Sequence, residues 1–259
     1  MNKNQVAKND IIALIPVNKG SKITFTIEDK SQKIQGLGVY NSSKLIGTPY
    51  GQAITLGRNK YWLLPASTLD LIDTLTRKAQ IILPKDAALI VIYCNLKPGS
   101  RVVEGGVGSG ALTIVLLNIV GVNGKVTTYE TNKTFAKIAS QNIQKANLTN
   151  NWVLKIQDIT KGISETDLDA VVIDIPEPWL VVEHVYNALR PGGTFASYIP
   201  TMNQVERLVT TLKKRFFIEI QTFETLFRNL TVGPGGTRPA FDMLGHTGYI
   251  TIGRKVIEK

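Results

Sequence analysis

The sequence predicts an α/β protein: a mostly parallel sheet covered by helices on both faces, preceded by a smaller β-rich part. From residue 100 onward, apolar strand-like runs alternate with amphipathic helical segments, a pattern typical of such sheets. Residues 11–64 instead contain short strand-like runs separated by turns, which indicate a separate β-rich unit. We therefore expect a β-rich N-terminal domain at residues 1–76 and an α/β domain at residues 77–259.

The N-terminal part has short strands, and two helices are predicted between these strands and the first strand of the α/β part. "KITFTI" alternates, "GLGVYNSSKLIGTPYG" is rich in turn residues, and "YWLLP" ends in a proline. Leu69, Ile72 and Leu75 have helical spacing and predict a helix over residues 67–82, with Ser67 or Thr68 as its N-cap. A second helix is expected over residues 86–96, before the turn "KPGS".

The α/β part is expected to alternate regularly. The predicted strands are residues 101–106, 125–130, 151–156, 168–175, 191–199, 216–224 and 247–254, and the predicted helices are residues 109–120, 133–147, 179–189 and 203–214. The segment "GPGGTRP" (233–239) is expected to be a mobile loop. In such sheets ligands bind beyond the carboxyl ends of the strands, near the switch in strand order.

The composition favours a cytoplasmic protein with a polyanionic partner. Cys94 is the only cysteine, so neither a disulfide framework nor a thiolate metal site is expected. No apolar run approaches the roughly 20 residues of a membrane span, and the first ten residues lack the apolar core of a secretion signal. The net charge is +10, and residues 1–100 hold 13 Lys and Arg against 6 Asp and Glu. A basic surface of this kind favours nucleic acid, although a solvated lysine surface explains the charge equally well.

The stretch "VVEGGVGSGALT" (102–113) contains four glycines in six residues, directly after a predicted strand. A triphosphate-binding loop would continue with Lys and Ser or Thr, whereas Ala111 and Leu112 follow here. A dinucleotide site stays possible, because Gly106, Gly108 and Ala111 match G-x-G-x-x-G/A and an acid at the end of the next strand could bind a ribose. The glycines alone establish only that a ligand approaches the backbone.

Acidic residues at successive strand ends favour S-adenosylmethionine over a dinucleotide. Glu104 precedes the glycines, Asp158 follows the third strand in "QDI", and Asp174 ends the fourth strand in "DIPEPW". A carboxylate at Glu104 would repel a pyrophosphate but suits a ligand that carries ammonium and sulfonium charges. Each acid has an ordinary alternative as a helix cap or a surface carboxylate. Their occurrence at successive strand ends makes coincidence an unsatisfactory explanation.

These residues also carry a resemblance to a known family. The segments that carry it are "RKAQIILPKDAALI", "VVEGGVGSGALT", "TTYE", "QDI", "DAVVIDIPEPW", "LRPGGTFASYIPTMNQV" and "TRPAFDMLGHTGYI". Together they are similar to the tRNA (adenine-N1)-methyltransferases, which modify the T-loop adenine at tRNA position 58 and, in archaeal members, also position 57. The resemblance implies a Rossmann-like class I S-adenosylmethionine-dependent methyltransferase fold. Three positions depart from the family pattern, namely Gly105, Val107 and Leu83, the last of which replaces a common tyrosine near the target base.

The resemblance implies roles for individual residues. Asp174 is expected to be the catalytic residue. The residues expected to bind S-adenosylmethionine are Glu104, Gly106, Val107, Gly108, Ser109, Gly110, Glu130 (ribose), Asp158 (adenine), Ile159 and Asp174. Those expected near the tRNA substrate are Pro176, Trp179, Arg238 and His246, although helix-start packing explains Trp179 equally well. The family also implies a homotetramer that binds tRNA, with no metal and no membrane.

Two other functions stay open from the sequence. The chain could methylate another substrate, such as a small molecule or a protein, and it would then need no tRNA affinity. It could also be a non-catalytic tRNA-binding subunit, although intact Glu130, Asp158 and Asp174 argue against that. An NAD-dependent oxidoreductase is a more distant possibility.

Overall fold

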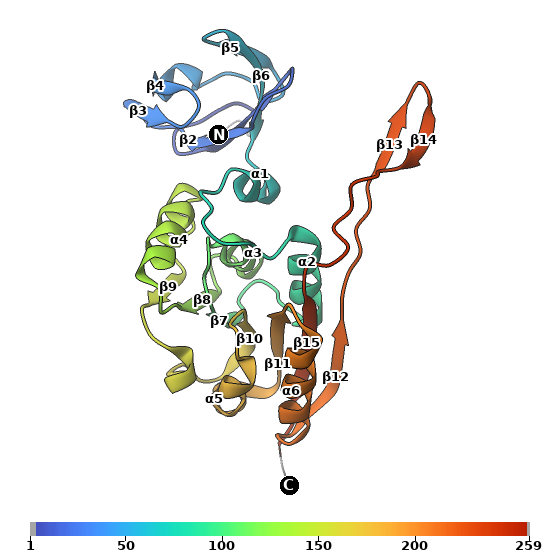
Figure 1. Cartoon of the computed structure of the whole chain (residues 1–259). Helices are drawn as coiled ribbons and strands as arrows, with labels where there is room; N and C mark the ends of the chain where they lie inside the picture. Colours follow the sequence, from blue (N-terminus) through green and yellow to red (C-terminus); the bar gives the residue numbers. More distant parts are fainter. Residues whose placement is uncertain (1–3, 258–259) are drawn as a thin grey trace.

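The computed structural model describes residues 4–257, and its N-terminal part is an antiparallel sheet with a core of its own. The sheet has the strand order β2-β1-β6-β5, and a separate hairpin pairs β3 with β4 (Figure 1). The elements are β1 (Ile11–Pro16), β2 (Ile23–Thr26), β3 (Ser31–Ile34), β4 (Gly38–Asn41), the 3-10 turn η1 (Ser42–Leu45), β5 (Ala53–Leu56) and β6 (Asn59–Pro65). Ile12, Leu14 and Leu63 are fully buried and belong to a cluster made only of residues from this part.

A seven-stranded sheet forms the centre of the larger part, as the alternating pattern predicts. Its strands are β7 (Arg101–Gly105), β8 (Lys125–Tyr129), β9 (Trp152–Lys155), β10 (Leu168–Ile173), β11 (Leu189–Ile199), β12 (Phe217–Phe223) and β15 (Tyr249–Lys255), in the order β12-β15-β11-β10-β7-β8-β9. The five strands from β11 to β9 are parallel, whereas β15 pairs antiparallel with β11 and β12. The strand order reverses between β7 and β10, so the switch point lies at the ends of these two strands.

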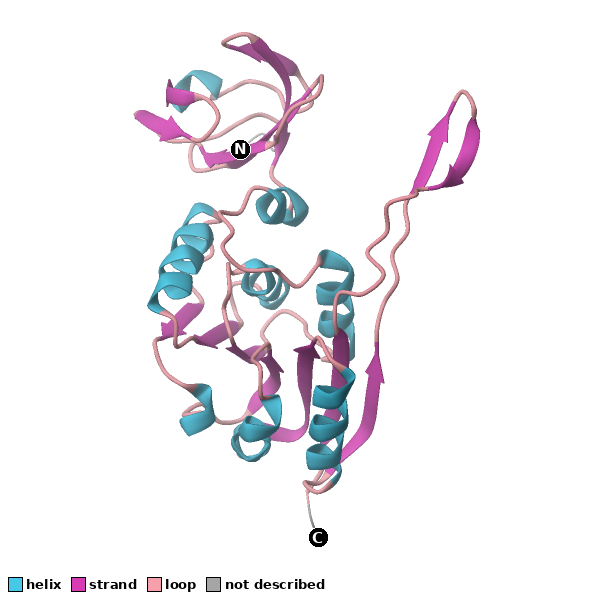
Figure 2. Cartoon of the chain, viewed as in Figure 1, coloured by secondary structure: helices cyan, strands magenta, loops and turns pink. Residues whose placement is uncertain are grey.

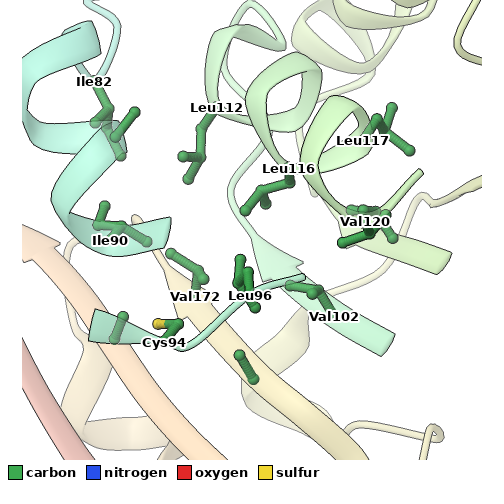
Figure 3. Close-up of a cluster of buried hydrophobic side chains, with 14 of the residues drawn as sticks. Ile82, Ile90, Cys94, Leu96, Val102, Leu112, Leu116, Leu117, Val120 and Val172 are labelled. Atoms are coloured by element: carbon green, nitrogen blue, oxygen red, sulfur yellow. The ribbon is translucent and has the colours of Figure 1, made fainter. Parts of the chain in front are cut away.

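Helices cover both faces of this sheet (Figure 2). They are α2 (Pro84–Tyr93), α3 (Ala111–Val120), α4 (Lys133–Lys145), α5 (Val182–Ala188) and α6 (Met202–Lys213), with the 3-10 turns η2 (Ile159–Lys161) and η3 (Pro178–Val181). On one face α2, α3 and α4 bury a cluster that includes Ile90, Leu116 and Val172 (Figure 3). On the other face α5 and α6 pack through Val185 and Leu208. Burial of these apolar side chains, at roughly 25 cal/mol per Å², is the main force that holds the layers together.

The predicted helix over residues 67–82 is wrong beyond its first turns. The observed helix α1 (Thr68–Asp73) begins with a capping box between Ser67 and Asp70, and Leu69 is 54% exposed. From Thr74 to Leu83 the chain is a non-helical linker, and Ile81 packs against Ile72 and Ala111. The apolar residues of this segment are therefore buried by packing against other parts of the chain, and they do not form one face of a single helix. Leu83 also precedes Pro84, and a residue before proline disfavours the helical conformation.

Two other expectations need correction. The predicted helix over residues 179–189 is divided into η3 and α5. The predicted mobile loop at 233–239 is part of a hairpin between β13 (Leu230–Gly233) and β14 (Gly236–Pro239). This hairpin lies at the end of a long arm, residues 224–247, which projects from the sheet between β12 and β15 (Figure 1). The turn at Pro234 and Gly235 allows the flanking residues to pair.

Candidate functional site

The glycine loop and the loop after β10 meet at the switch point of the sheet. The Gly106 amide donates to the Tyr129 carbonyl at 2.9 Å, and the Asp174 amide donates to the Gly105 carbonyl at 2.8 Å. Gly106 has φ +89°, and a Cβ there would lie 2.2 Å from the carbonyl oxygen of Asp174. Only glycine fits this position. The loop ends at Gly110, which has φ +83° and is the N-cap residue of α3.

Glu104 is held in the interior below the glycine loop. It is 1% exposed, and one carboxylate oxygen accepts hydrogen bonds from the Thr113 and Thr128 hydroxyls at 2.7 and 2.8 Å. Burial raises the pKa of Glu104 to about 7, the two hydrogen bonds oppose the rise, and the negative charges of Asp174 and Glu130 add to it. Glu104 therefore lies close enough to Asp174 and Glu130 for their negative charges to disfavour its ionised form.

Glu130 organises the glycine loop. One of its carboxylate oxygens accepts from the Val107 amide at 3.0 Å, and the other accepts from the Asn132 amide at 2.7 Å. The residue is 8% exposed. Glu130 therefore connects the loop after β7 to the start of α4, and its remaining lone pairs are free to accept from ligand hydroxyls.

Asp174 lies at the carboxyl end of β10, open to solvent but surrounded on most sides by the protein. This environment raises the pKa of Asp174 to about 6, first through the loss of surrounding water and then through the negative charge of Glu130. Its neighbour in the sheet is the end of β11, where Ser197 pairs with Ile173. Asp174 consequently stands next to Tyr198, and Tyr198 has its pKa raised to about 12 by burial first and in part by Asp174.

Asp158 and Ile159 follow β9, the edge strand that pairs with β8. Asp158 is the N-cap of η2, and its Oδ1 accepts from the Thr160 amide and hydroxyl at 2.9 and 2.7 Å. These hydrogen bonds lower the pKa of Asp158. Ile159 is buried, and its side chain would meet a Cβ on Gly105 at 3.0 Å. Asp158 is thus a helix cap, as its ordinary alternative role predicts. Capping uses only Oδ1, so Oδ2 can still accept a hydrogen bond from a ligand.

Sequence reasoning missed Asn142, which fastens the linker to the glycine loop. Its amide nitrogen donates to the Ser109 and Thr76 carbonyls at 2.9 and 3.0 Å, and its oxygen accepts from the Thr76 amide at 3.1 Å. The Lys78 amide also donates to the Ser109 hydroxyl at 3.4 Å. The sequence signal was a polar residue at helical spacing from Ile138 and Ala139, on the predicted inward face of the helix. In the structure Asn142 lies in α4 and is 2% exposed.

The residues expected near the substrate are only partly brought together. Pro176 is exposed, and its carbonyl accepts from Gln204 at 2.8 Å. The Trp179 ring lies 4.2 Å from the Arg207 guanidinium, and its buried Nε1 finds no partner among the described residues. Arg238 is on β14 in the projecting arm, over the Phe241 ring, and the structure does not place it beside Asp174.

His246 is fixed at the base of the arm by both ring nitrogens. Nδ1 lies 3.0 Å from the Glu224 carboxylate and Nε2 lies 2.8 Å from the Pro200 carbonyl. Both partners are acceptors, so the protonated imidazolium suits them best, and these bonds raise the pKa of His246. His184, in α5, has its Nε2 3.1 Å from the Thr160 carbonyl.

The site fits a cationic, adenosine-bearing ligand better than a pyrophosphate. Three carboxylates converge on the glycine loop, and two of them have raised pKa values partly because of mutual repulsion. A ligand with positive charge relieves that repulsion, whereas phosphates would increase it. Among residues 4–257 no group of three His, Cys, Asp or Glu could hold a metal ion. No helix in the same range is long and apolar enough to cross a membrane.

The sheet order, the glycine loop and the carboxylates define a class I methyltransferase that uses S-adenosylmethionine. Among solved structures, an S-adenosylmethionine-dependent O-methyltransferase from Thermotoga maritima has TM-score 0.84 and 33% identity, over 99% of this chain and 96% of that one. The tRNA (m1A58) methyltransferase TrmI from Aquifex aeolicus has TM-score 0.78 and 29% identity, over 98% of this chain and 100% of that one.

The sequence comparisons identify the family. The pattern of the tRNA methyltransferase complex GCD14 subunit matches residues 61–234. The tRNA (adenine(57)-N(1)/adenine(58)-N(1))-methyltransferase TrmI of Methanocaldococcus jannaschii is 34% identical over 220 residues, which cover 75% of this chain and 78% of the relative. TrmI of Thermus thermophilus, named for adenine 58 alone, is 32% identical over 69% of this chain and 71% of its own length. The chain belongs to this GCD14/TrmI family.

Proposed function

We propose that this protein transfers a methyl group from S-adenosylmethionine to N1 of an adenine in the tRNA T loop, either at position 58 alone or at positions 57 and 58. The observation that carries the proposal is the position of Asp174, next to the glycine loop at the switch point and open to solvent. The family supports the choice of substrate, since the relatives from M. jannaschii and T. thermophilus are named for this reaction.

The cofactor residues are proposed from the site and the family together. When bound, S-adenosylmethionine supplies a methyl group on a positively charged sulfur. Gly106 and Gly108 allow close approach of the backbone, and Glu104 provides negative charge below the loop. Glu130 would accept hydrogen bonds from ribose hydroxyls, and Asp158 would accept one from the adenine amino group. The full proposed set adds Val107, Ser109, Gly110, Ile159 and Asp174.

Asp174 would act on the acceptor base. Adenine N1 is a neutral nitrogen with a free lone pair, so no strong base is needed before it attacks the methyl carbon. A carboxylate that accepts from the 6-amino group orients N1 and stabilises the positive charge that develops on the ring. Asp174 could later receive a proton from the product. Its raised pKa suits a group that accepts a proton near neutral pH.

The RNA would be held by several parts of the chain. The target adenine is buried in folded tRNA, so we propose that the base is extruded, at a cost of a few kcal/mol. The basic N-terminal domain, residues 1–76, would offset part of that cost through phosphate contacts. Trp179 and Pro176 would border the base, His246 would shape the wall beside it, and Arg238 would contact RNA away from the reacting adenine.

We also propose a cytoplasmic homotetramer, with the arm as the contact between copies. The arm exposes large apolar side chains, and exposed apolar patches of this kind are typical of surfaces that bind another protein. They are Leu226, Phe227, Leu230, Val232, Phe241, Met243 and Leu244, between 41% and 81% exposed. β12 is also an edge strand of the large sheet, paired on one side with β15, and its other side is open to pairing with another chain. Light scattering should give four copies for the wild type and fewer for Phe227→Ser/Phe241→Ser.

The identity of the substrate can be tested by an assay of methyl transfer from labelled S-adenosylmethionine to unmodified tRNA transcripts. The nucleosides of the product are then analysed. Formation of 1-methyladenosine in the T loop, lost when adenines 57 and 58 are both replaced, supports the proposal. The similarity to the T. maritima O-methyltransferase favours one rival, a methyltransferase for another substrate. That rival predicts cofactor binding without tRNA methylation or tRNA affinity, whereas a non-catalytic subunit predicts tRNA affinity without methylation.

A further inference from the structure

A buried ion pair at the start of α2 fastens both ends of the arm. The Lys85 ammonium lies 2.8 Å from Asp86 Oδ1 and donates to the Thr225 carbonyl at 2.9 Å and the Thr247 hydroxyl at 2.8 Å. Asp86 accepts from the Thr225 hydroxyl at 2.6 Å and from the Thr247 hydroxyl at 3.0 Å. Thr225 and Thr247 are the residues at which the arm leaves and rejoins the body. We call this set of four residues the latch.

The latch is sequestered from solvent. The Asp86 side chain is fully buried and that of Lys85 is 13% exposed. Charges in such a place are retained only when they are paired and hydrogen-bonded. Lys85 is 140 positions from Thr225 and 162 positions from Thr247 in the chain. The arm is therefore held at both of its roots by a single polar centre.

The same centre contacts the strand end beside Asp174. The Tyr198 hydroxyl donates to Asp86 Oδ2 at 3.4 Å. The Tyr198 ring packs against Gly248, where a Cβ would come within 2.5 Å of the ring. Tyr198 lies near the end of β11, and Asp174 directly follows β10. The two residues are side by side because Ser197 pairs with Ile173. A shift of the latch would thus move Tyr198 and the segment 246–248 relative to Asp174.

We propose that Lys85 and Asp86 are positioning residues for the acceptor side of the active site. They act through Tyr198 and the segment 246–248, and they hold the arm and the wall beside Asp174 in one fixed arrangement. The proposal rests on the proposed function, since it assigns the acceptor side to this wall. The cofactor side is held by different residues, Glu130 and Asn142, and should be unaffected.

A purely structural role predicts a different outcome. Replacement of a buried ion pair by apolar side chains of similar size is often neutral for stability, whereas removal of one partner is strongly destabilising. The double variant Lys85→Met/Asp86→Leu therefore separates the two roles. If the pair only stabilises the fold, a folded double variant should be as active as the wild type.

The experiment compares this double variant with the wild type and with a control at the other end of the sheet. The control is Arg190→Met/Asp169→Asn, which removes the ion pair at the amino ends of β10 and β11. We expect the double variant to keep its Tm within a few degrees and its affinity for S-adenosylmethionine within twofold. We expect kcat for tRNA methylation to fall about 10- to 100-fold, as displacement of about 1 Å would cause. The control should retain wild-type kcat.

Two further measurements keep the test decisive. Thr225→Val/Thr247→Val leaves the ion pair intact but removes the hydroxyl contacts, and it replaces the double variant if that one does not fold. Hydrogen exchange should accelerate at residues 222–226, 198 and 245–249 in either variant. Wild-type kcat together with unchanged exchange would overturn the proposal. If the wild type itself does not methylate tRNA, the proposed function fails, and the exchange data alone decide whether the latch holds this wall.

Discussion

The carbonyl oxygen of Asp174 lies so close to Gly106 that a Cβ on the glycine would come within 2.2 Å of it. The loop expected to hold the cofactor and the acid expected to act on the base are thus in direct backbone contact. The contact arises because β7 and β10 are neighbours at the switch point. Displacement of either loop therefore displaces the other.

Gly106→Ala should abolish cofactor binding and destabilise the protein. The new methyl group cannot coexist with the backbone oxygen of Asp174, and the φ of +89° is strained for alanine. We expect a Tm loss of several degrees and no measurable binding by calorimetry. Gly108→Ala is the matched control, since its φ is +51° and nothing lies within 4 Å of its Cβ position. If the two variants have the same Tm, the backbone contact does not constrain the loop.

Asp174→Asn should reduce methyl transfer about 100- to 1,000-fold while the protein stays folded. The amide keeps the size of the side chain but carries no charge to stabilise the methylated ring. Single-turnover rates with tRNA, and the affinity for S-adenosylmethionine measured separately, check this expectation. A rate within tenfold of the wild type would exclude Asp174 as the catalytic carboxylate.

The rate should depend on pH through Asp174. Its pKa is raised to about 6, so the carboxylate is ionised at pH 8 and protonated at pH 5. We expect kcat/KM to rise about tenfold per pH unit below pH 6 and to level off above pH 7. The residual rate of Asp174→Asn should lack this rise. A wild-type profile that is flat from pH 5 to pH 8 would contradict the assignment.

Glu104→Gln should stabilise the ligand-free protein at pH 8 more than at pH 5. The folded-state pKa of Glu104 is raised from 4.5 to about 7, so the folded state binds the proton more tightly than the unfolded state. The free energy of unfolding therefore falls as the pH rises through this window, and glutamine avoids that loss. Thermal unfolding should show a gain of a few degrees at pH 8, since about 1 kcal/mol moves Tm by roughly 2–4 °C.

The same substitution should weaken binding of the cationic cofactor at pH 8. Calorimetric titration with S-adenosylmethionine measures this, and neutral adenosine is the matched control ligand. Equal loss of affinity for both ligands would indicate distortion of the loop rather than loss of charge.

Asn142→Ala should weaken cofactor binding without contact to the cofactor. The change removes the bonds that connect Ser109 with Thr76 and leaves the buried Ser109 carbonyl unpaired, at about 1–3 kcal/mol. We expect a lower Tm and a severalfold weaker affinity for S-adenosylmethionine. Asn118→Ala, which removes a bond to Ile114 within α3, is the control and should keep wild-type affinity.

The sheet and the approach of the acids to one another could be predicted from the sequence. Strand-like runs and helical spacing depend on nearby residues, and the carboxyl ends of parallel strands converge at one edge. By this rule Glu104, Asp158 and Asp174 are expected at one edge of the sheet, and the family resemblance adds Glu130. The family was also evident from motifs such as "DIPEPW".

The end of α1 at Asp73 and the contacts of Asn142 and of the latch became evident only from the folded structure. Each depends on groups distant in the chain: Thr76 with Asn142 is 66 positions apart, and Lys85 with Thr247 is 162. Local propensity carries no information about such pairs, because their free energy arises only when packing brings the groups together and removes water. The buried charge at Asp86 is stable for this reason, and no short stretch of sequence reveals it.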